Sequence, residues 1–178
     1  MGSMATEDMI LRPLRGFFRA RKMLVTGASS GIGRDIALVL AGLGVKTALL
    51  ARRQVMLENL ASAIRNQGGD ALVLTADISR REEVRHAIAS ALGELGHIDI
   101  LINSAGILEP GAVETMDSQS LQRMLDVNVL GTLHTIQAVL PSMRQAGSGN
   151  IVNIGSLAGA AGYPRLAVIQ PPNLPWWG

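Results

Sequence analysis

Residues 26–33, with the sequence Thr-Gly-Ala-Ser-Ser-Gly-Ile-Gly, are the stretch that decides the fold of this chain. A short apolar run at 23–25 precedes them, and a helical pattern of apolar residues follows over 32–43. A strand, a glycine turn and a helix start in close succession favour pyrophosphate binding, because the free N–H groups of the first helical turn face the anion. In this interpretation Gly27 allows the sharp turn, Gly31 lets the backbone approach a phosphate, and Gly33 lets the helix pack closely on the sheet.

From residue 23 onward the sequence alternates between strand and helix patterns. Apolar runs occur at 23–25, 47–50, 71–75, 98–102 and 150–154, and helical patterns lie between them at 32–43, 55–66, 81–95 and 118–143. This alternation, with continuous apolar strands, predicts a doubly wound, Rossmann-like α/β fold with a parallel sheet of about five strands. We divide the chain into a basic extension (1–22), a dinucleotide-binding domain (23–168) and a tail (169–178).

Composition narrows the class of protein further. Apolar residues make up 48% of the 178 residues but aromatic residues only 3%, so the core is expected to be aliphatic. The absence of cysteine excludes disulfides and thiolate chemistry and fits a reducing compartment, so we expect a cytoplasmic protein. No apolar run reaches the length of a membrane span. Three scattered histidines suggest surface positions rather than a metal site: His86, His97 and His134.

Positive charge is concentrated at the N-terminus. The formal net charge is +2, but residues 1–22 carry five cationic and two anionic side chains, so the rest of the chain has a net charge of −1. The folded part therefore lacks the basic stripe of a nucleic-acid-binding protein. Arginines alternate with leucine and phenylalanine over 9–22, which is open to two interpretations: an amphipathic targeting or membrane-surface segment, or a solvated extension leading into the first strand.

The spacing Gly-x-x-x-Gly-x-Gly with a preceding Thr resembles the short-chain dehydrogenase/reductase family, from about residue 23 to residue 168. That resemblance implies a nicotinamide cofactor, with Ser29, Ser30 and Ile32 in its site beside the three glycines. Arg52 follows the second strand, nineteen residues beyond Gly33, where a dinucleotide fold places the residue that meets the adenosine ribose. An arginine there favours the 2′-phosphate of NADP over the 2′-hydroxyl of NAD, and Arg53 adds a second cation. The alternative is that both arginines merely solvate the start of the next helix.

Two more turns resemble cofactor-binding segments of the family. Asp77 and Ile78 follow the third strand, and the family uses an aspartate at this position to bind the adenine amino group. The alternative role, a helix N-cap, is better filled by Ser79 before Glu82, which leaves Asp77 for the cofactor. After the fourth strand, Asn-Ser-Ala-Gly resembles the Asn-Asn-Ala-Gly of the family and adds to the cofactor site the residues Asn103, Ala105 and Gly106.

The family transfers a hydride between the nicotinamide and a carbonyl or alcohol carbon. A tyrosine exchanges the proton, a lysine four residues later lowers the pKa of that tyrosine, a serine orients the substrate, and an asparagine supports a proton-relaying water. Asn128, in Asn-Val-Leu-Gly, and Ser156, directly after the fifth strand, match the last two residues of this set. The alternatives are an exposed helical asparagine and an ordinary turn serine.

The tyrosine and the lysine are missing from their expected positions. Position 169 is Ile169 and position 173 is Asn173, while the only tyrosine, Tyr163, is seven residues after Ser156 and has no lysine partner. The tail holds three prolines, which forbid the helix that the family has there. The codons AAA-TCT-GCC-GTG-GTG-GG would encode Lys-Ser-Ala-Val-Val-Gly, a continuation typical of the family, and the same bases read one base later would encode the observed residues 173–178. We therefore hypothesise a frameshift or truncation after about residue 168, although no single shift also explains residues 169–172.

Three interpretations of function remain open from the sequence. The first is an NADP-dependent oxidoreductase acting on a small carbonyl or alcohol, the second is a nucleotide-binding fragment without catalysis, and the third is a non-functional product of an altered reading frame. The resemblance implies about two further strands and three helices after the catalytic segment, so the sheet is expected to be incomplete. The fifth strand is then expected to be an exposed edge, and helix 118–143 to lose cover over Leu121, Leu125, Val129 and Leu133. The resemblance implies a homo-oligomer through helix 118–143.

Overall fold

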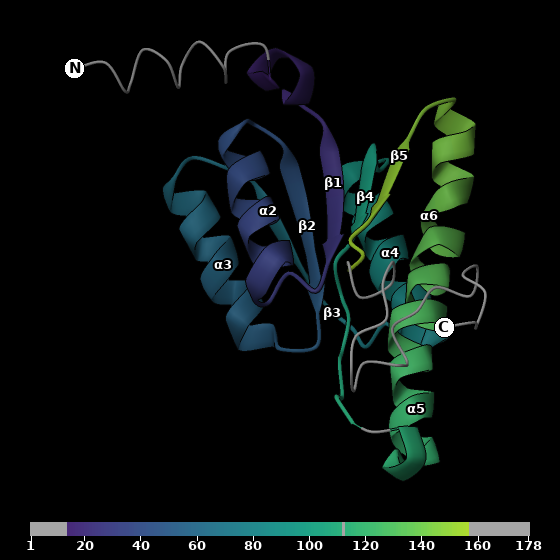
Figure 1. Cartoon of the computed structure of the whole chain (residues 1–178). Coiled ribbons are helices and arrows are strands. Elements are labelled where there is room, and N and C mark those ends of the chain that lie inside the picture. Colours follow the sequence, from purple (N-terminus) through teal and green to yellow (C-terminus); the bar gives the residue numbers. More distant parts are fainter. Residues whose placement is uncertain (1–13, 112, 157–178) are drawn as a thin grey trace.

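A computed structural model describes residues 14–111 and 113–156. Its five strands form one parallel sheet in the order β3-β2-β1-β4-β5 (Figure 1). The strands are β1 (Lys22–Thr26), β2 (Lys46–Ala51), β3 (Ala71–Thr75), β4 (Ile100–Asn103) and β5 (Asn150–Asn153). The predicted fold class and all five strands are therefore confirmed, with boundaries within two residues of those expected.

Helices cover both faces of this sheet, as Figure 1 shows. The helices α2 (Gly31–Gly42) and α3 (Gln54–Asn66) pack on one face, where they meet Met23 and Val25 of β1. On the other face, α4 (Arg81–Leu95) and α6 (Thr132–Ala146) pack against Leu24. Successive side chains of β1 thus point to opposite faces, and all three are fully buried, which explains why this strand reads as a continuous apolar run.

The helix predicted over 118–143 is not a single regular helix. It consists of α5 (Ser118–Leu125), a π-helical turn η2 (Asp126–Gly131) and then α6. A π-helical turn adds a residue to the helical repeat and is frequent at functional sites. The turn contains Asn128, and Gly131 at its end lies so close to Ile78 that a Cβ there would be 2.7 Å from the Ile78 side chain.

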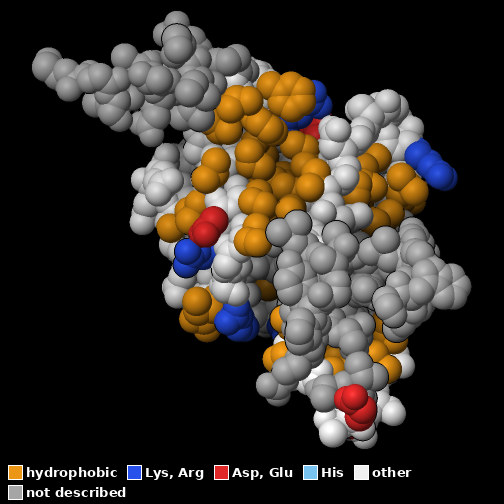
Figure 2. Space-filling model, viewed as in Figure 1, with side chains coloured by type: hydrophobic (Ala, Val, Ile, Leu, Met, Phe, Trp, Pro, Cys, Tyr) orange, Lys and Arg blue, Asp and Glu red, His pale blue; other side chains and the backbone are white. Residues whose placement is uncertain are grey.

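Apolar side chains are exposed on the edge strand β5 and along α5, η2 and α6. The edge strand β5 has no strand on its outer side among the described residues, and its Val152 is exposed. Hydrophobic side chains also gather in the middle of the face that Figure 2 shows. On α5, η2 and α6, four large side chains are between 38% and 51% exposed, as the sequence predicted: Leu121, Leu125, Val129 and Leu133.

Asp99 joins the amino-terminal ends of β1 and β4, at the end of the strands opposite the glycine turn. Its carboxylate, only 8% exposed, accepts hydrogen bonds from the backbone N–H of Lys22 (2.8 Å) and from the Arg21 guanidinium (3.0 Å), and lies 3.3 Å from Nε2 of His97. Burial raises the pKa of Asp99, but these partners outweigh it, so the net pKa lies below its ordinary value. The charged form therefore stabilises the fold.

The substitution Asp99→Asn is expected to lower the free energy of unfolding at pH 7 by about 1–3 kcal/mol, since it removes a buried, charge-assisted acceptor. Because the folded pKa is depressed, the stabilisation by Asp99 is present above the unfolded pKa of about 3.9 and is lost as the pH falls through the folded value. Urea unfolding of both proteins between pH 7 and pH 2.5 measures this, and a constant difference over that range would contradict it.

Candidate functional site

The glycine turn after β1 is held at close quarters by its neighbours. Gly27 has a positive φ of 69°, and a Cβ there would be 2.7 Å from the backbone of Ala105. A Cβ on Gly33 would be 2.8 Å from the carbonyl oxygen of Gly27. Gly31, with φ of 58°, differs because nothing lies within 4 Å of the position of its Cβ. Gly27 and Gly33 therefore permit close packing, whereas Gly31 leaves room above the start of α2.

Thr26 links this turn to the loop after β4. Its fully buried hydroxyl oxygen accepts hydrogen bonds from the backbone N–H groups of Ser104 (3.2 Å) and Ala105 (3.1 Å). The carboxyl ends of β1 and β4 are neighbours in the sheet, and the chain leaves them toward opposite sides. This is the crevice where open parallel sheets bind ligands.

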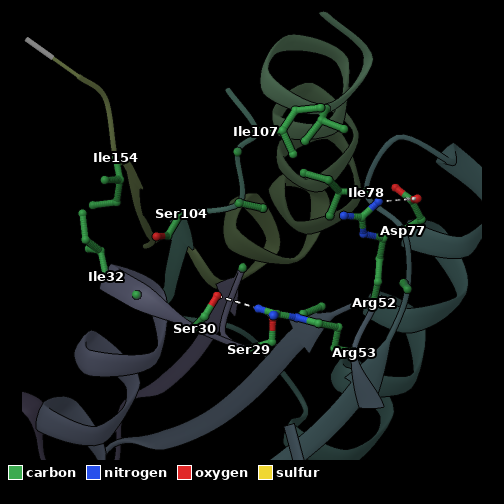
Figure 3. Close-up of a pocket in the computed structure, with 17 residues that line it drawn as sticks. Ser29, Ser30, Ile32, Arg52, Arg53, Asp77, Ile78, Ser104, Ile107 and Ile154 are labelled. Carbon is green, nitrogen blue, oxygen red and sulfur yellow. Dashed lines mark hydrogen bonds and ion pairs between the residues drawn. The ribbon is translucent and has the colours of Figure 1, made fainter. Parts of the chain in front are cut away.

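A cleft of about 460 Å³ lies in this crevice. Figure 3 shows its walls, which come from the glycine turn, the ends of β2, β3 and β4, the π-helical turn and the segment after β5. The lining residues are Gly27, Ser29, Ser30, Gly31, Ile32, Ala51, Arg52, Arg53, Ala76, Asp77, Ile78, Ser104, Ala105, Gly106, Ile107, Val127 and Ile154. Eleven of the thirteen residues that the sequence predicted for cofactor binding are among them, all except Gly33 and Asn103.

The two arginines after β2 have different partners (Figure 3). The Arg53 guanidinium donates hydrogen bonds to the hydroxyl oxygens of Ser29 (2.9 Å) and Ser30 (2.6 Å), so it lies over the glycine turn. Arg52 instead points to Asp77, with its Nη1 3.7 Å from the carboxylate. Arg53 is thus placed beside the turn, while the charge of Arg52 is partly balanced.

The expected cap of α4 by Ser79 is wrong. The helix begins at Arg81, and Ser79 donates hydrogen bonds from both its backbone N–H (3.0 Å) and its hydroxyl (2.8 Å) to the carboxylate of Asp77. Burial raises the pKa of Asp77, but the bonds from Ser79 and the charges of Arg52 and Arg80 bring it below its ordinary value. Asp77 is therefore an anion at neutral pH, and it is not free of protein partners.

Asn103 and Asn128 support the cleft. Asn103 is buried, where its side chain contacts Asn153 (2.9 Å) and Thr135 (2.7 Å). The Asn128 side chain holds the backbone of Ile107 on both sides, accepting from its N–H and donating to its carbonyl, each at 2.9 Å. Asn128 is thus not the exposed helical asparagine of the alternative interpretation. Its amide fixes the loop after β4 that forms one wall of the cleft.

The remaining predicted positions are divided by the limits of the described residues. Ser156 lies three residues beyond β5 and is exposed, close in sequence to the cleft residue Ile154. Tyr163, Ile169, Asn173 and the tail 169–178 lie outside the described residues, as do residues 1–13. Six lining residues were not among the predicted site residues: Ala51, Ala76, Ser104, Ile107, Val127 and Ile154. Only their positions within two residues of predicted site residues could have indicated them.

Of the three histidines, His86 lies at the surface as expected, whereas His97 and His134 are partly buried. His97 is partly buried, with Nδ1 3.1 Å from Nζ of Lys22, and His134 lies with Nδ1 3.0 Å from the carbonyl oxygen of Ile78. Within residues 14–111 and 113–156, no three histidine, aspartate or glutamate side chains are grouped for a metal ion. In the same part of the chain, no helix has the length and apolar character needed to cross a membrane.

A parallel sheet with a glycine turn and a cleft at its switch point defines the class of nucleotide-binding α/β proteins. Comparison with known proteins places the chain more closely: the family described as short chain dehydrogenase matches residues 21–168. The chain belongs to the short-chain dehydrogenase/reductase family, an oxidoreductase family that uses nicotinamide cofactors.

Relatives and solved structures agree with this assignment. An uncharacterized oxidoreductase of Staphylococcus saprophyticus is 44% identical over 138 residues, covering 76% of this chain and 58% of the relative. A 3-oxoacyl-(acyl-carrier-protein) reductase of Staphylococcus epidermidis is 35% identical over 148 residues, covering 83% and 61%. The crystal structure of NAD⁺-bound xylitol dehydrogenase matches with a TM-score of 0.83 and 35% identity, covering 85% and 59%. The chain thus spans about three fifths of the length of these proteins.

The substitution Asn128→Ala is expected to lower the free energy of unfolding by about 2 kcal/mol, because the N–H and the carbonyl of Ile107 both lose their partner. The control is Val39→Ala: Val39 is 62% exposed on α2, outside the helical segment 118–143, and its substitution is expected to change the free energy of unfolding by less than about 0.5 kcal/mol. Thermal unfolding of the three proteins compares them. Equal losses for both variants would contradict the support that we assign to Asn128.

Proposed function

We propose that the cleft binds NADP(H), and that the chain is the cofactor-binding part of an oxidoreductase acting on a small carbonyl or alcohol. Family membership supports the reaction class, and the two cations after β2 support the phosphorylated cofactor. The relatives named above act on different kinds of molecule, to judge from their names alone, so we commit to no particular substrate.

The residues present fit a dinucleotide. The start of α2 presents the backbone N–H groups of its first turn, where the helix dipole favours a negative charge. Ser30 precedes α2 but makes no side-chain cap, so its hydroxyl does not compete for those N–H groups. The space over Gly31 admits a phosphate close to the backbone. These features support the predicted pyrophosphate site.

The position of Arg53 is the observation that carries the preference for NADP(H). Its guanidinium is held by the hydroxyls of Ser29 and Ser30 at the rim of the cleft, and we expect these three side chains to donate together to a 2′-phosphate. The sequence prediction emphasised Arg52, but Arg52 is shared with Asp77. We therefore assign the larger part of phosphate binding to Arg53, and to Arg52 a secondary part beside an adenine bound at Asp77.

Asp77 is the one acidic residue among those that line the cleft. It follows β3 rather than β2, and its carboxylate already interacts with Ser79 and Arg52. An acid that accepts from the ribose 2′-hydroxyl, as NAD-binding sites have after β2, is absent from this wall. This supports NADP(H) over NAD(H).

For catalysis we propose the roles that the family resemblance assigns. The bound cofactor supplies or accepts the hydride. Ser156 orients the substrate oxygen, and Asn128 supports a proton-relaying water. The Asn128 side chain also holds the loop after β4 through Ile107. The carboxyl end of β4, which carries Asn103, is kept in place by the buried contacts with Asn153 and Thr135.

A second candidate function is nucleotide binding without turnover. One sequence observation favours it: Ile169 and Asn173 occupy the positions at which the family has its tyrosine and lysine. Without a positioned proton donor and its activator, the family reaction is expected to slow by several orders of magnitude. The frameshift hypothesis for the tail is tested by the coding DNA.

We also propose that the chain works in the cytoplasm, since it lacks cysteine, and that it pairs with a second copy through α5 and α6. The exposed apolar side chains on those helices, Leu125 and Leu133 among them, support the pairing. Sedimentation over a range of concentrations tests it.

The first prediction from the proposed function concerns the choice between NADPH and NADH. Titration followed by cofactor fluorescence is expected to show saturable binding that favours NADPH over NADH. Arg53→Ala is expected to raise the Kd for NADPH at least tenfold while leaving that for NADH within about twofold, since one charge-assisted interaction contributes roughly 1.5–3 kcal/mol. Arg52→Ala is expected to have the smaller effect on NADPH.

The matched control is Arg85→Ala, which removes one exposed arginine from α4, where its guanidinium pairs with Glu82. It is expected to leave both dissociation constants unchanged. Equal losses of NADPH and NADH affinity in Arg53→Ala would argue against 2′-phosphate recognition. A larger loss in Arg52→Ala would reverse the assignment of the two arginines.

The second prediction separates the two candidate functions. With NADPH bound, the chain is expected to reduce a panel of aldehydes and ketones no faster than a protein-free control, because its proton donor is missing. NADPH oxidation measured by absorbance tests this. Turnover that disappears in Ser156→Ala would overturn the second candidate function and support the oxidoreductase.

A further inference from the structure

The segment before β1 is not part of the cofactor cleft and has no role in the proposed function. Residues 14–18 form a helical turn, and Ala20, with a positive φ of 65°, redirects the chain into β1. In Figure 1 this segment lies at the top, beside the starts of the strands, whereas the glycine turn lies at their opposite ends. Its backbone is tied to the body by a hydrogen bond from Ala20 N–H to the carbonyl of Gly44 (3.3 Å).

Two adjacent phenylalanines of this turn have opposite environments. Phe18 packs against the hydrophobic core on the α2 face of the sheet. Phe17 is 59% exposed, although its ring lies edge-on to Phe18 at 5.1 Å and beneath the Arg21 guanidinium at 5.6 Å. Arg21 is itself fixed by its ion pair with Asp99. Phe17 is therefore held in an outward position, with Leu14, 41% exposed, one helical turn away.

Cationic side chains surround these apolar ones. Arg15 and Arg19 are exposed, and among the described residues neither forms an ion pair with a carboxylate. Lys22 and Arg21 follow at the start of β1. Figure 2 shows hydrophobic side chains with a cationic one beside them at the upper end of the described surface. Two uncompensated arginines thus border two exposed apolar groups.

We propose that this N-terminal basic surface, formed by Leu14, Arg15, Phe17 and Arg19, binds the surface of an anionic phospholipid bilayer. An aromatic ring and a leucine suit the boundary between headgroups and acyl chains, and arginines beside them pair with anionic headgroups. The positive charge of the surface complements the negative bilayer, and its apolar groups distinguish a bilayer from a soluble polyanion.

Binding at this surface leaves the cofactor cleft accessible. The surface precedes β1 and lies near the amino-terminal ends of the strands, whereas Gly27 and Asp77 follow the carboxyl ends of β1 and β3. A bilayer bound beside Phe17 therefore contacts neither Arg53 nor the mouth of the cleft. The inference is independent of the proposed function and does not require the chain to be catalytic.

The test is flotation of the full chain with vesicles in a density gradient, which separates vesicle-bound protein from aggregates because aggregates do not float. Vesicles of phosphatidylcholine and phosphatidylserine (7:3) are expected to carry at least five times more protein than vesicles of phosphatidylcholine alone. Both Phe17→Ser and the double variant Arg15→Gln, Arg19→Gln are expected to lose at least four fifths of this binding. Raising the ionic strength is expected to weaken it.

Two matched controls accompany these variants. Arg81→Gln with Arg85→Gln removes two exposed arginines from α4, and Val55→Ser removes an exposed apolar side chain from α3. Both are expected to float like the unchanged chain. Equal flotation with neutral and anionic vesicles would overturn the proposal. A loss of flotation in the α4 double variant equal to the loss in Arg15→Gln, Arg19→Gln would also overturn it. Unchanged flotation of Phe17→Ser would overturn it as well, because binding by charge alone would indicate a surface for soluble polyanions.

Discussion

The cleft depends on how closely the carboxyl ends of β1 and β4 approach each other. The Thr26 hydroxyl accepts two backbone N–H groups from the loop after β4, and Gly27 lies so near Ala105 that a side chain between them is impossible. The turn and the loop therefore form one rigid wall. From this wall α2 leaves on one side of the sheet and the chain after β4 on the other, so their separation opens the crevice.

The charged side chains around the crevice differ in their partners. Arg52 and Asp77 partly balance each other, and Asp77 is kept ionised by Ser79. Among the described residues, the Arg53 guanidinium has only hydroxyl partners, so no carboxylate there balances its charge. Two neighbouring arginines that look equivalent in the sequence thus have different environments, because the carboxylate of Asp77, which follows another strand, pairs with Arg52.

Asn128 shows how a helix of irregular geometry takes part in the same wall. The π-helical turn brings its amide against the backbone of Ile107, and Gly131 lets the following helix approach Ile78. At the amino-terminal ends of the strands, the Asp99 carboxylate interacts with Lys22, Arg21 and His97. That carboxylate also fixes Arg21 over Phe17, so the clamp that stabilises the sheet also orients the proposed lipid-binding ring.

Local sequence determined much of the fold and of the cofactor site. Alternating apolar runs and helical patterns predicted the parallel strands because β1, β2 and β4 are buried on both faces and therefore have nearly continuous apolar sequences. The spacing from Gly33 predicted that Arg52 and Arg53 lie at the cleft, because the β-α-β unit has a nearly constant length. The proposed roles of Ser156 and Asn128 rest on resemblance and stay predictions. Only the tertiary structure decided that Ser79 binds Asp77 instead of capping α4, that Arg53 rather than Arg52 lies over the glycine turn, and that Asn128 holds Ile107. These contacts join residues from different loops, and side-chain hydrogen bonds of that kind have no periodicity along the chain from which they could be predicted.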